Sequence, residues 1–274
     1  ETGLSETVAG RVVWTDINGD GWQDCILQKE SVFINSPDPK DAKKRIFVPF
    51  TTDANISVNP KDPKGKRVAD MIILADVDND YDLDILISCK RCAGSLLFRN
   101  DGAGRFTDDS RALPAYTNNY DFEAMDLDGD GFLDLVTIND GDVVDEHGSS
   151  RREHVFRNDG KGRFRDATTR WWPAEFNIGE DDNVVAFLDY DSDGDADFVI
   201  GSLSGPSRLL INDGKGHLTL ARDVFAGPAA PGTLGLALAD LDGDGRMDVV
   251  VGQGEHPTAN QERVYFGTGL TPFT

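Results

Sequence analysis

An aspartate-rich nonapeptide recurs five times along the chain with constant internal spacing. Acidic or amide oxygens occupy positions 1, 3, 5 and 9 of every copy. Carboxylates ~4 Å apart repel one another by about 4 kcal/mol per pair at an effective dielectric of ~20. A bound cation removes this repulsion, and ligand sets made only of oxygen favour Ca²⁺ over zinc or copper. The spacing therefore predicts up to five calcium-binding loops.

Each predicted ligand set combines the side chains at positions 1, 3, 5 and 9 with the backbone carbonyl at position 7. In chain order the sets are Asp16, Asn18, Asp20, Trp22 and Asp24; Asp76, Asp78, Asp80, Asp82 and Asp84; Asp126, Asp128, Asp130, Phe132 and Asp134; Asp189, Asp191, Asp193, Asp195 and Asp197; and Asp240, Asp242, Asp244, Arg246 and Asp248. The second copy has Tyr81 where the others have glycine. Position 6 usually needs a left-handed backbone, which is uncommon for Tyr, so we expect this site to be weaker.

The loops are not EF-hands, although both patterns begin alike. An EF-hand needs a glutamate at position 12 and a helix on each side. Position 12 here is Leu27, Ile87, Thr137, Ile200 or Val251. The flanking runs are short, apolar and β-branched, as in Ile85-Leu86-Ile87, which is typical of strands. Each loop is therefore predicted to be the turn of a β-hairpin.

The loop belongs to a larger repeat with a period of roughly 50 to 63 residues, which is typical of propellers and solenoids. Three units add an Asn-Asp-Gly-x-Gly turn between apolar runs, beginning at Asn100, Asn158 and Asn212. This turn is a strong hairpin signal. One unit thus reads as four antiparallel strands, which is a propeller blade. The fold class is all-β, and the predicted blades are approximately 8–60, 68–112, 120–170, 182–225 and 232–274.

Two of the units are irregular. The first lacks the Asn-Asp-Gly turn, and a longer, Lys-rich connection is expected from Ile34 through about residue 70. The fifth ends at or just inside its fourth strand. Residues 4–10 supply the missing edge strand, or the five units belong to a larger ring; the sequence leaves both open. Glu1-Thr2-Gly3 looks like the scar of a secretion vector, so residues 4–274 are taken as one propeller domain.

The repeat resembles the FG-GAP/VCBS family of calcium-binding blades, which is related to the propeller of integrin α-subunits. The resemblance covers about residues 8–273 and depends on the five Asp motifs. It implies a β-propeller with calcium in the loop joining the first two strands of each blade. Phe266-Gly267 alone matches the Phe-Gly signature of integrin-type repeats, which favours the VCBS-like branch. Seven blades are usual in that group, so the blade number stays open.

The formal net charge of the chain is −22, and 21 of its 49 acidic residues lie in the five nonapeptides. Five Ca²⁺ ions would reduce the net charge to about −12, so metal binding explains much of the acidity. Such a charge argues against nucleic acid or an anionic membrane as partner. No apolar run approaches the ~18 residues of a membrane span. A secreted or cell-surface location is expected.

Three cysteines are an odd number for a secreted chain. Cys89 and Cys92 are close enough for a turn disulfide, while no helix supports a redox site and no second Cys pair supports zinc. Cys25 lies in a predicted strand and is expected to be a buried free thiol. Asn55 begins an Asn-Ile-Ser sequon and is a candidate glycosylation site.

A binding surface is expected on the loops opposite the calcium hairpins, where the repeats differ most. Its candidates are His147, Arg151, Arg152, Trp171, Trp172, Glu255 and His256. Aromatic and Arg side chains are common anchors of recognition surfaces. The alternatives are that the Trp residues pack between blades and that the His and Arg residues are solvated.

Three functions are compatible with this organisation. The leading one is a non-enzymatic extracellular adhesion module with a protein partner and an unknown oligomeric state. The second is a lectin, although the four Trp residues share no common repeat position. The third is a polysaccharide lyase or hydrolase. No nucleophile–base motif is visible, and the acids cluster where calcium is expected, which disfavours catalysis.

Overall fold

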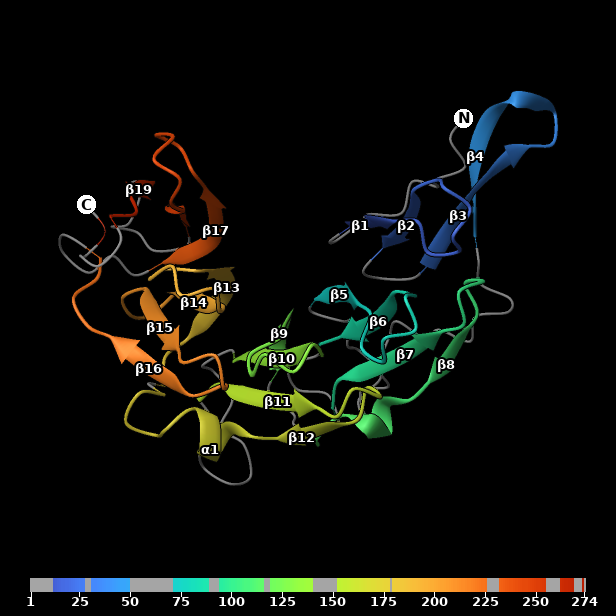
Figure 1. The fold of residues 1–274 in the computed structure, drawn as a ribbon. Coiled ribbons are helices and arrows are strands. Elements are labelled where there is room, and N and C mark those ends of the chain that lie inside the picture. The colour runs from blue at the N-terminus through green and yellow to red at the C-terminus, as the bar shows by residue number, and fades with distance from the viewer. Residues whose placement is uncertain are drawn as a thin grey trace. The chain divides into compact units, whose positions relative to one another are not determined.

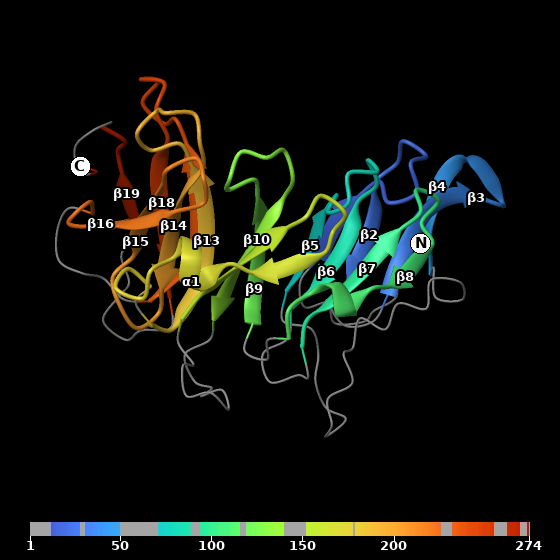
Figure 2. The same ribbon diagram turned by 60° about the horizontal axis from the view of Figure 1, so that its bottom comes forward.

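The computed structural model describes residues 12–27, 31–49, 71–88, 94–115, 119–139, 152–177, 179–225, 232–254, 262–268 and 273. These residues form five antiparallel sheets whose strands follow one another in chain order (Figures 1 and 2). The all-β class and the blade repeat are therefore confirmed.

The first sheet contains β1 (Val12–Thr15), β2 (Asp24–Leu27), β3 (Ser31–Asp38) and β4 (Asp41–Pro49). The second contains β5 (Ile72–Ala75), β6 (Asp84–Ile87), β7 (Leu96–Asn100) and β8 (Phe106–Asp108). The third contains β9 (Asn119–Met125), β10 (Asp134–Asn139), β11 (His154–Asn158) and β12 (Phe164–Asp166). The fourth contains β13 (Asp182–Leu188), β14 (Asp197–Ser202), β15 (Arg208–Asn212) and β16 (Leu218–Ala221). The fifth contains β17 (Thr233–Ala239), β18 (Asp248–Gln253) and β19 (Arg263–Tyr265).

Helix is confined in the described part to two short turns, η1 (Ser110–Ala112) and α1 (Thr168–Trp171). No described helix has the length and apolar character needed to span a bilayer. The fifth sheet has three strands among the described residues. Residues 4–10, which we considered as its fourth strand, lie outside them.

The chain divides into two compact units. The first comprises residues 1–122 together with 160–163, and the second comprises residues 123–159 together with 164–274. Our expectation of one propeller domain over residues 4–274 stays a prediction.

The second strand of each blade explains why the apolar runs are continuous rather than alternating. Every residue of β6, β10 and β14 is buried. A strand covered on both faces needs apolar side chains in both directions, so Val, Ile and Leu follow one another. These strands begin with the aspartate at position 9, which places the acidic loop directly on the most buried strand of the blade.

Neighbouring blades pack face to face within each unit. In the first unit, Ile26 and Ile34 of the first blade meet Ile85 and Phe98 of the second. In the second unit, one cluster joins the third and fourth blades, and another joins Val199 of the fourth blade to the fifth. These clusters include Ile17 and Leu127, which lie at position 2 of the first and third acidic loops, so the packing between blades holds these two loops beside the next blade.

The first blade differs from the predicted pattern. A Lys-rich connection was expected after Ile34, but β3 and β4 instead form a long hairpin that turns between Asp38 and Asp41. The prediction was wrong because the exposed Lys residues suggested a loop. Polar residues suit a strand that is exposed on an edge, since β4 pairs on one side only.

The single-residue predictions have mixed outcomes. Cys25 is a buried free thiol, as expected. The proposed disulfide between Cys89 and Cys92 and the proposed glycosylation site at Asn55 lie outside the described residues.

Candidate metal sites

The five acidic loops share one backbone conformation. Position 6 has a positive φ in every copy, and Tyr81 adopts +72° in the second. Position 4 is also left-handed throughout, including Asn79 and Ser192 where the other copies have glycine. Because Tyr81 takes the expected left-handed conformation, its loop keeps the common shape despite the missing glycine.

The carboxylate at position 1 shapes the loop by accepting two backbone N–H groups. In the third copy the N–H of Asp130 donates to Asp126 Oδ1 at 3.1 Å, and the N–H of Gly131 donates to Asp126 Oδ2 at 2.8 Å. Position 5 accepts from position 7 in the same way, with 3.0 Å between Phe132 N and Asp130 Oδ1. All five loops repeat these contacts. The local sequence thus turns the side chains of positions 1 and 5 inward.

The carboxylate at position 9 ties the loop to the neighbouring hairpin. Asp134 Oδ2 accepts the N–H of Leu127 at 3.2 Å, and its Oδ1 accepts the N–H of Asn158 at 2.8 Å. The position-9 aspartates are all fully buried. A buried carboxylate with two N–H partners holds position 9 in place, and each oxygen retains a further lone pair for a cation.

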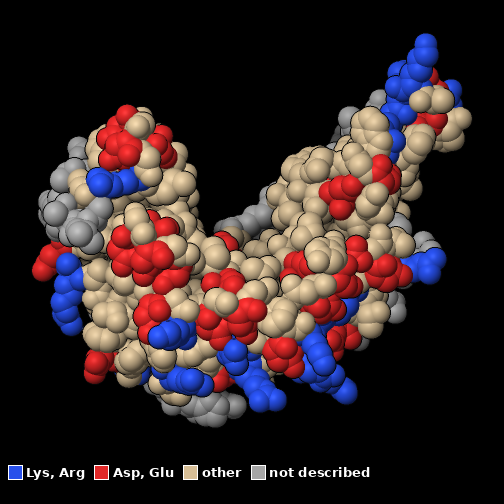
Figure 3. All heavy atoms as spheres, in the orientation of Figure 1, with Lys and Arg blue, Asp and Glu red and all other residues tan. Residues whose placement is uncertain are grey.

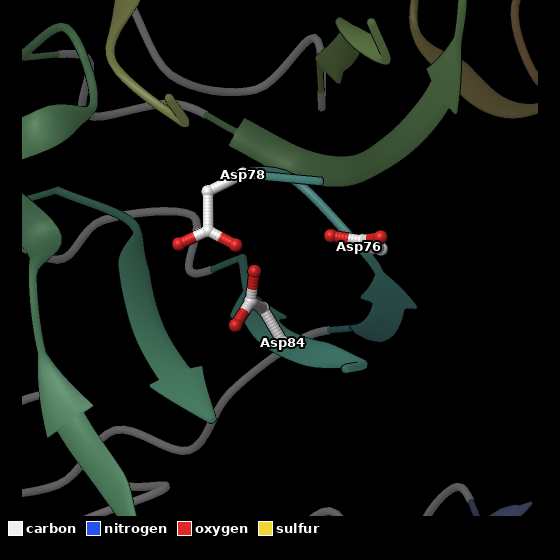
Figure 4. Close-up of side chains that lie close together, drawn as sticks. All are labelled: Asp76, Asp78 and Asp84. Carbon is white, nitrogen blue, oxygen red and sulfur yellow. The ribbon is translucent and has the colours of Figure 1, made fainter. Parts of the chain in front are cut away.

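Positions 1, 3 and 9 converge in four of the five loops. One carboxylate oxygen from each of these positions lies within 4.8 Å of the others in the loops that begin at Asp76, Asp126, Asp189 and Asp240. Figure 4 shows the second of the five loops, in which Asp76, Asp78 and Asp84 surround one space. The first loop has the amide Asn18 at position 3.

The aspartate at position 3 provides the most direct sign of a cation site. Oδ1 of Asp78, Asp128 and Asp191 is buried and accepts no hydrogen bond. Buried polar atoms are nearly always hydrogen-bonded, and leaving one without a partner costs about 1–3 kcal/mol. The same atom is orphaned in three loops, and its carboxylate belongs to the converging group each time. These residues therefore fit a hard cation.

The acidic crowding is visible in the pKa values of the carboxyls. Burial raises the pKa of Asp134 and Asp197 to about 7 and that of Asp84 to about 6. Burial, followed by the charges of Asp193 and Asp191, raises the pKa of Asp195 to about 6. Each shift means that the ionised loop is costly in the protein alone, and a bound cation would offset this cost. Figure 3 shows acidic side chains gathered in separate patches.

The predicted ligands at position 5 and the backbone carbonyls at position 7 lie in these loops. The converging groups consist of positions 1, 3 and 9, so the roles of positions 5 and 7 stay predictions. Asp82 and Asp195, at position 7, place their carboxylates against Gly102 and Gly214 of their own blades.

Two of the Asn-Asp-Gly turns connect an acidic loop to the next blade. Asn100 Nδ2 donates to the carbonyl of Ile17, at position 2 of the first loop, over 3.0 Å. Asn212 Nδ2 donates in the same way to the carbonyl of Leu127 over 2.9 Å. The turn that signalled a hairpin in the sequence therefore also positions the neighbouring loop.

Among the described residues, three arginines that lie outside the acidic loops contact them, and none of the three was predicted from the sequence. Arg157 of β11 pairs with Asp128 and Asp130, and Arg99 of β7 pairs with Asp78. Arg45 of β4 lies 3.4 Å from Asp20. A usable signal was present, because Arg99 and Arg157 each directly precede the Asn of an Asn-Asp-Gly turn.

A second buried polar group lies outside the loops, in the second unit. Glu153 is fully buried beside Asp182, and Arg208 donates to Asp182. Asn177 brackets the backbone of Glu153 with hydrogen bonds of 2.8 and 3.1 Å. Burial raises the pKa of Glu153 well above its usual range, and the charge of Asp182 adds to the shift.

The predicted ligand-binding surface needs correction at two positions. Trp171 and Trp172 are 2% and 1% exposed and belong to the core between the third and fourth blades. They cannot anchor a ligand, because apolar contacts within the blades cover both rings. Arg152 is exposed. The other candidates, which are His147, Arg151, Glu255 and His256, lie outside the described residues.

Two segments of the chain match a known family of repeats. A family model described as FG-GAP-like repeat matches residues 76–137 and 189–251. Cartilage acidic protein 1 of Xenopus tropicalis is 27% identical over 176 residues, which cover 59% of this chain and 25% of that protein. The chain therefore spans about a quarter of this relative.

One solved structure shares the fold over nearly the whole chain. A lectin of Agrocybe aegerita that recognises non-reducing terminal N-acetylglucosamine has a TM-score of 0.58 at 22% identity, over 98% of this chain and 65% of its own. Rhamnogalacturonan lyase YesW has a TM-score of 0.40 at 17% identity, over 77% of this chain and 44% of its own. The chain thus contains FG-GAP-like repeats at residues 76–137 and 189–251 and has an all-β fold of the β-propeller type.

Proposed function

We propose that the chain is an extracellular, calcium-stabilised recognition module that binds a protein partner and has no catalytic role. The observation that carries the calcium assignment is the buried, unpaired Oδ1 of Asp78, Asp128 and Asp191 beside the carboxylates of positions 1 and 9. An extracellular location is supported by the similarity to cartilage acidic protein 1 and by the FG-GAP-like repeats.

Calcium has a structural role in this proposal. The ligands in each loop are the side chains of positions 1, 3, 5 and 9 and the carbonyl of position 7, as predicted from the sequence. An ion that binds only the folded chain stabilises it by about 2.7 kcal/mol per site at a hundredfold excess over its Kd. Five such sites would match the whole stability of an ordinary domain, which is ~5–15 kcal/mol. Calcium is therefore part of the fold.

The test compares thermal unfolding in excess Ca²⁺ and in EDTA, with bound calcium measured on the same samples. We expect binding of up to five ions and a loss of tens of degrees in Tm on chelation. Asp191→Ala should abolish one site, because it removes both side-chain oxygens at position 3, whereas Glu175→Ala removes an equal charge from an exposed residue outside the loops. Equal melting curves with and without calcium would refute the proposal.

Recognition is assigned to the sheet ends opposite the acidic loops. In an antiparallel blade the connection from the second to the third strand lies at the end opposite the first hairpin. These connections and those between blades differ most among the repeats, and they carry Arg152. A cell-surface binding screen with the calcium-loaded chain tests this assignment. Saturable binding that survives Asp191→Ala but is lost on replacing residues 141–152 supports it, whereas binding unaffected by that replacement contradicts it.

A glycan ligand is the second candidate, and the exposed tryptophans of the first blade favour it. Trp14 and Trp22 are both 51% exposed, and the guanidinium of Arg45 lies 4.1 Å from the centroid of the Trp22 ring. Exposed aromatic rings suit stacking on sugars. A glycan array run beside the cell-surface screen distinguishes the candidates. Glycan binding that Trp22→Ala abolishes would favour this one, and measurable turnover of a polysaccharide would overturn both.

A further inference from the structure

Arg157 occupies the third acidic loop in the way a bound cation would. Its Nε lies 2.6 Å from Asp128 Oδ2, and its Nη2 lies 2.9 Å from Asp130 Oδ2. These are positions 3 and 5 of the loop, both of which are predicted calcium ligands. The Arg157 side chain is 45% exposed and comes from β11 of the same blade. The guanidinium therefore neutralises the same carboxylates that a metal ion would use.

Arg99 has the equivalent place in the second blade. Its Nη1 lies 2.6 Å from Asp78 Oδ2 and 3.9 Å from Asp84 Oδ2. Its Nη2 donates to the carbonyls of Lys161 and Gly162 at 3.1 and 2.7 Å, within the same unit. A Cβ atom at Gly162, which has a φ of +63°, would overlap the guanidinium in this position, so glycine leaves room for it. Arg99 is thus held more firmly than Arg157, and its side chain is 12% exposed.

The fourth blade has the same architecture without the arginine. Ile211 precedes Asn212, as Arg99 precedes Asn100, and it pairs across the sheet with Thr219 as Arg99 does with Thr107. The loop at 189–197 has five aspartates, as does the loop at 76–84. Among the described residues, no Lys or Arg forms an ion pair with the loop at 189–197. The two loops therefore carry equal formal charge, and only the second-blade loop has a guanidinium.

We propose that Arg99 and Arg157 are internal counter-cations that set the calcium affinity of their loops. Each guanidinium stabilises the metal-free loop, and it must move away from, or remain beside, an incoming divalent ion. In both cases the loop binds calcium less tightly than a loop without arginine does. The loop at 189–197 therefore fills at lower calcium concentration than those at 76–84 and 126–134. This inference rests on the proposed binding of calcium and adds a ranking of the sites.

The expected size of the effect follows from Coulomb's law. A unit charge beside a divalent ion at ~4 Å, even in a water-like dielectric, changes a binding constant by roughly tenfold or more. Arginine suits this role better than lysine, because its planar fork can reach two carboxylates at once. Arg157 does so with Asp128 and Asp130.

Reciprocal exchange of the two residue types tests the proposal. Arg157→Ile gives the third blade the residue of the fourth, and Ile211→Arg gives the fourth blade the residue of the second and third. Calcium titrations followed by hydrogen exchange of peptides that span 126–134 and 189–197 report each loop separately. We expect Arg157→Ile to lower the calcium midpoint of 126–134 by roughly tenfold and Ile211→Arg to raise that of 189–197 similarly.

The matched control is Arg165→Ile, which removes an equal charge from the exposed residue opposite Arg157 on β12. It should shift the midpoint of 126–134 by less than about threefold, because no ion pair with the loop is lost. The inference is overturned if Arg157→Ile leaves that midpoint unchanged or raises it. If Ile211→Arg fails to fold, the removal variant still decides. Failure of the proposed calcium binding looks different, because no loop, including 189–197, would then respond to calcium in the unaltered chain.

Discussion

Asn100 is the residue whose replacement tests the arrangement of the blades most sharply. Its Nδ2 donates to the carbonyls of Ile17 and Leu83 at 3.0 and 3.2 Å. Its Oδ1 accepts the N–H groups of Gly102 and Gly104 at 3.2 and 3.1 Å. The side chain is buried. One amide therefore forms hydrogen bonds both to backbone groups of its own hairpin turn and to the acidic loop of the preceding blade. Asn100→Ala removes both sets of hydrogen bonds.

The fourth blade offers a natural comparison for the magnitude. Asn212 donates to Leu127 but has a buried Oδ1 with no partner. A net hydrogen bond contributes about 0.5–1.5 kcal/mol, and a buried partner left unpaired costs about 1–3 kcal/mol. With four bonds lost, some of them replaced by water, Asn100→Ala should reduce the free energy of unfolding by about 3–5 kcal/mol. Asn212→Ala loses one side-chain bond and should cost about 1–2 kcal/mol.

Urea denaturation in saturating calcium, with hydrogen exchange to assign each transition to its unit, measures both variants. Asn100→Asp keeps an acceptor for the turn but sets a buried carboxylate oxygen against the carbonyls of Ile17 and Leu83. It should destabilise the unit at least as much as Asn100→Ala does. The reasoning is refuted if Asn100→Ala destabilises its unit no more than Asn212→Ala does.

Three further predictions follow from buried or strained residues. Glu153→Gln should flatten the pH dependence of stability. The pKa of Glu153 is raised in the folded state. Its stabilising contribution is therefore complete below the unfolded pKa of about 4.5 and is lost as the pH rises through the folded pKa. Urea midpoints from pH 5 to 9 measure this, and a variant less stable than the unaltered chain at pH 9 would contradict the effect attributed to burial and to Asp182. Tyr81→Gly should stabilise by about 0.5–1 kcal/mol, because glycine accepts the +72° φ freely and the Tyr81 ring is 95% exposed. Thermal melts check this, with an unchanged or lower Tm as the contrary result. Trp171→Ala should cost about 3–5 kcal/mol, as expected for a large buried aromatic residue, and should leave ligand binding by the folded fraction intact. Chemical denaturation beside a binding assay separates the two effects, and loss of binding without loss of stability would restore Trp171 to the recognition surface.

The blades were predictable because their signals are local. Apolar runs such as Ile85-Leu86-Ile87 define strands of fixed length, and Asn-Asp-Gly turns define hairpins from the conformations that Asn and Gly accept. The first blade was predicted incorrectly after Ile34, because exposure at a sheet edge removes the hydrophobic pattern on which strand prediction depends. Burial of Trp171 and Trp172 was also beyond the sequence, since a Trp between two strands suits either a core or a binding surface.

The five acidic loops and their hairpin context could be predicted from the sequence, and so could the proposal of a hard cation, since alternate aspartates within nine residues leave few other ways to offset their charge. The sequence did not reveal which oxygens lack a hydrogen-bond partner, as Asp128 Oδ1 does, or which loops have an arginine beside them. These features depend on residues that are distant along the chain. Spacing within a loop is fixed by covalent geometry, whereas the approach of Arg157 or Asn212 depends on how separate strands and blades pack.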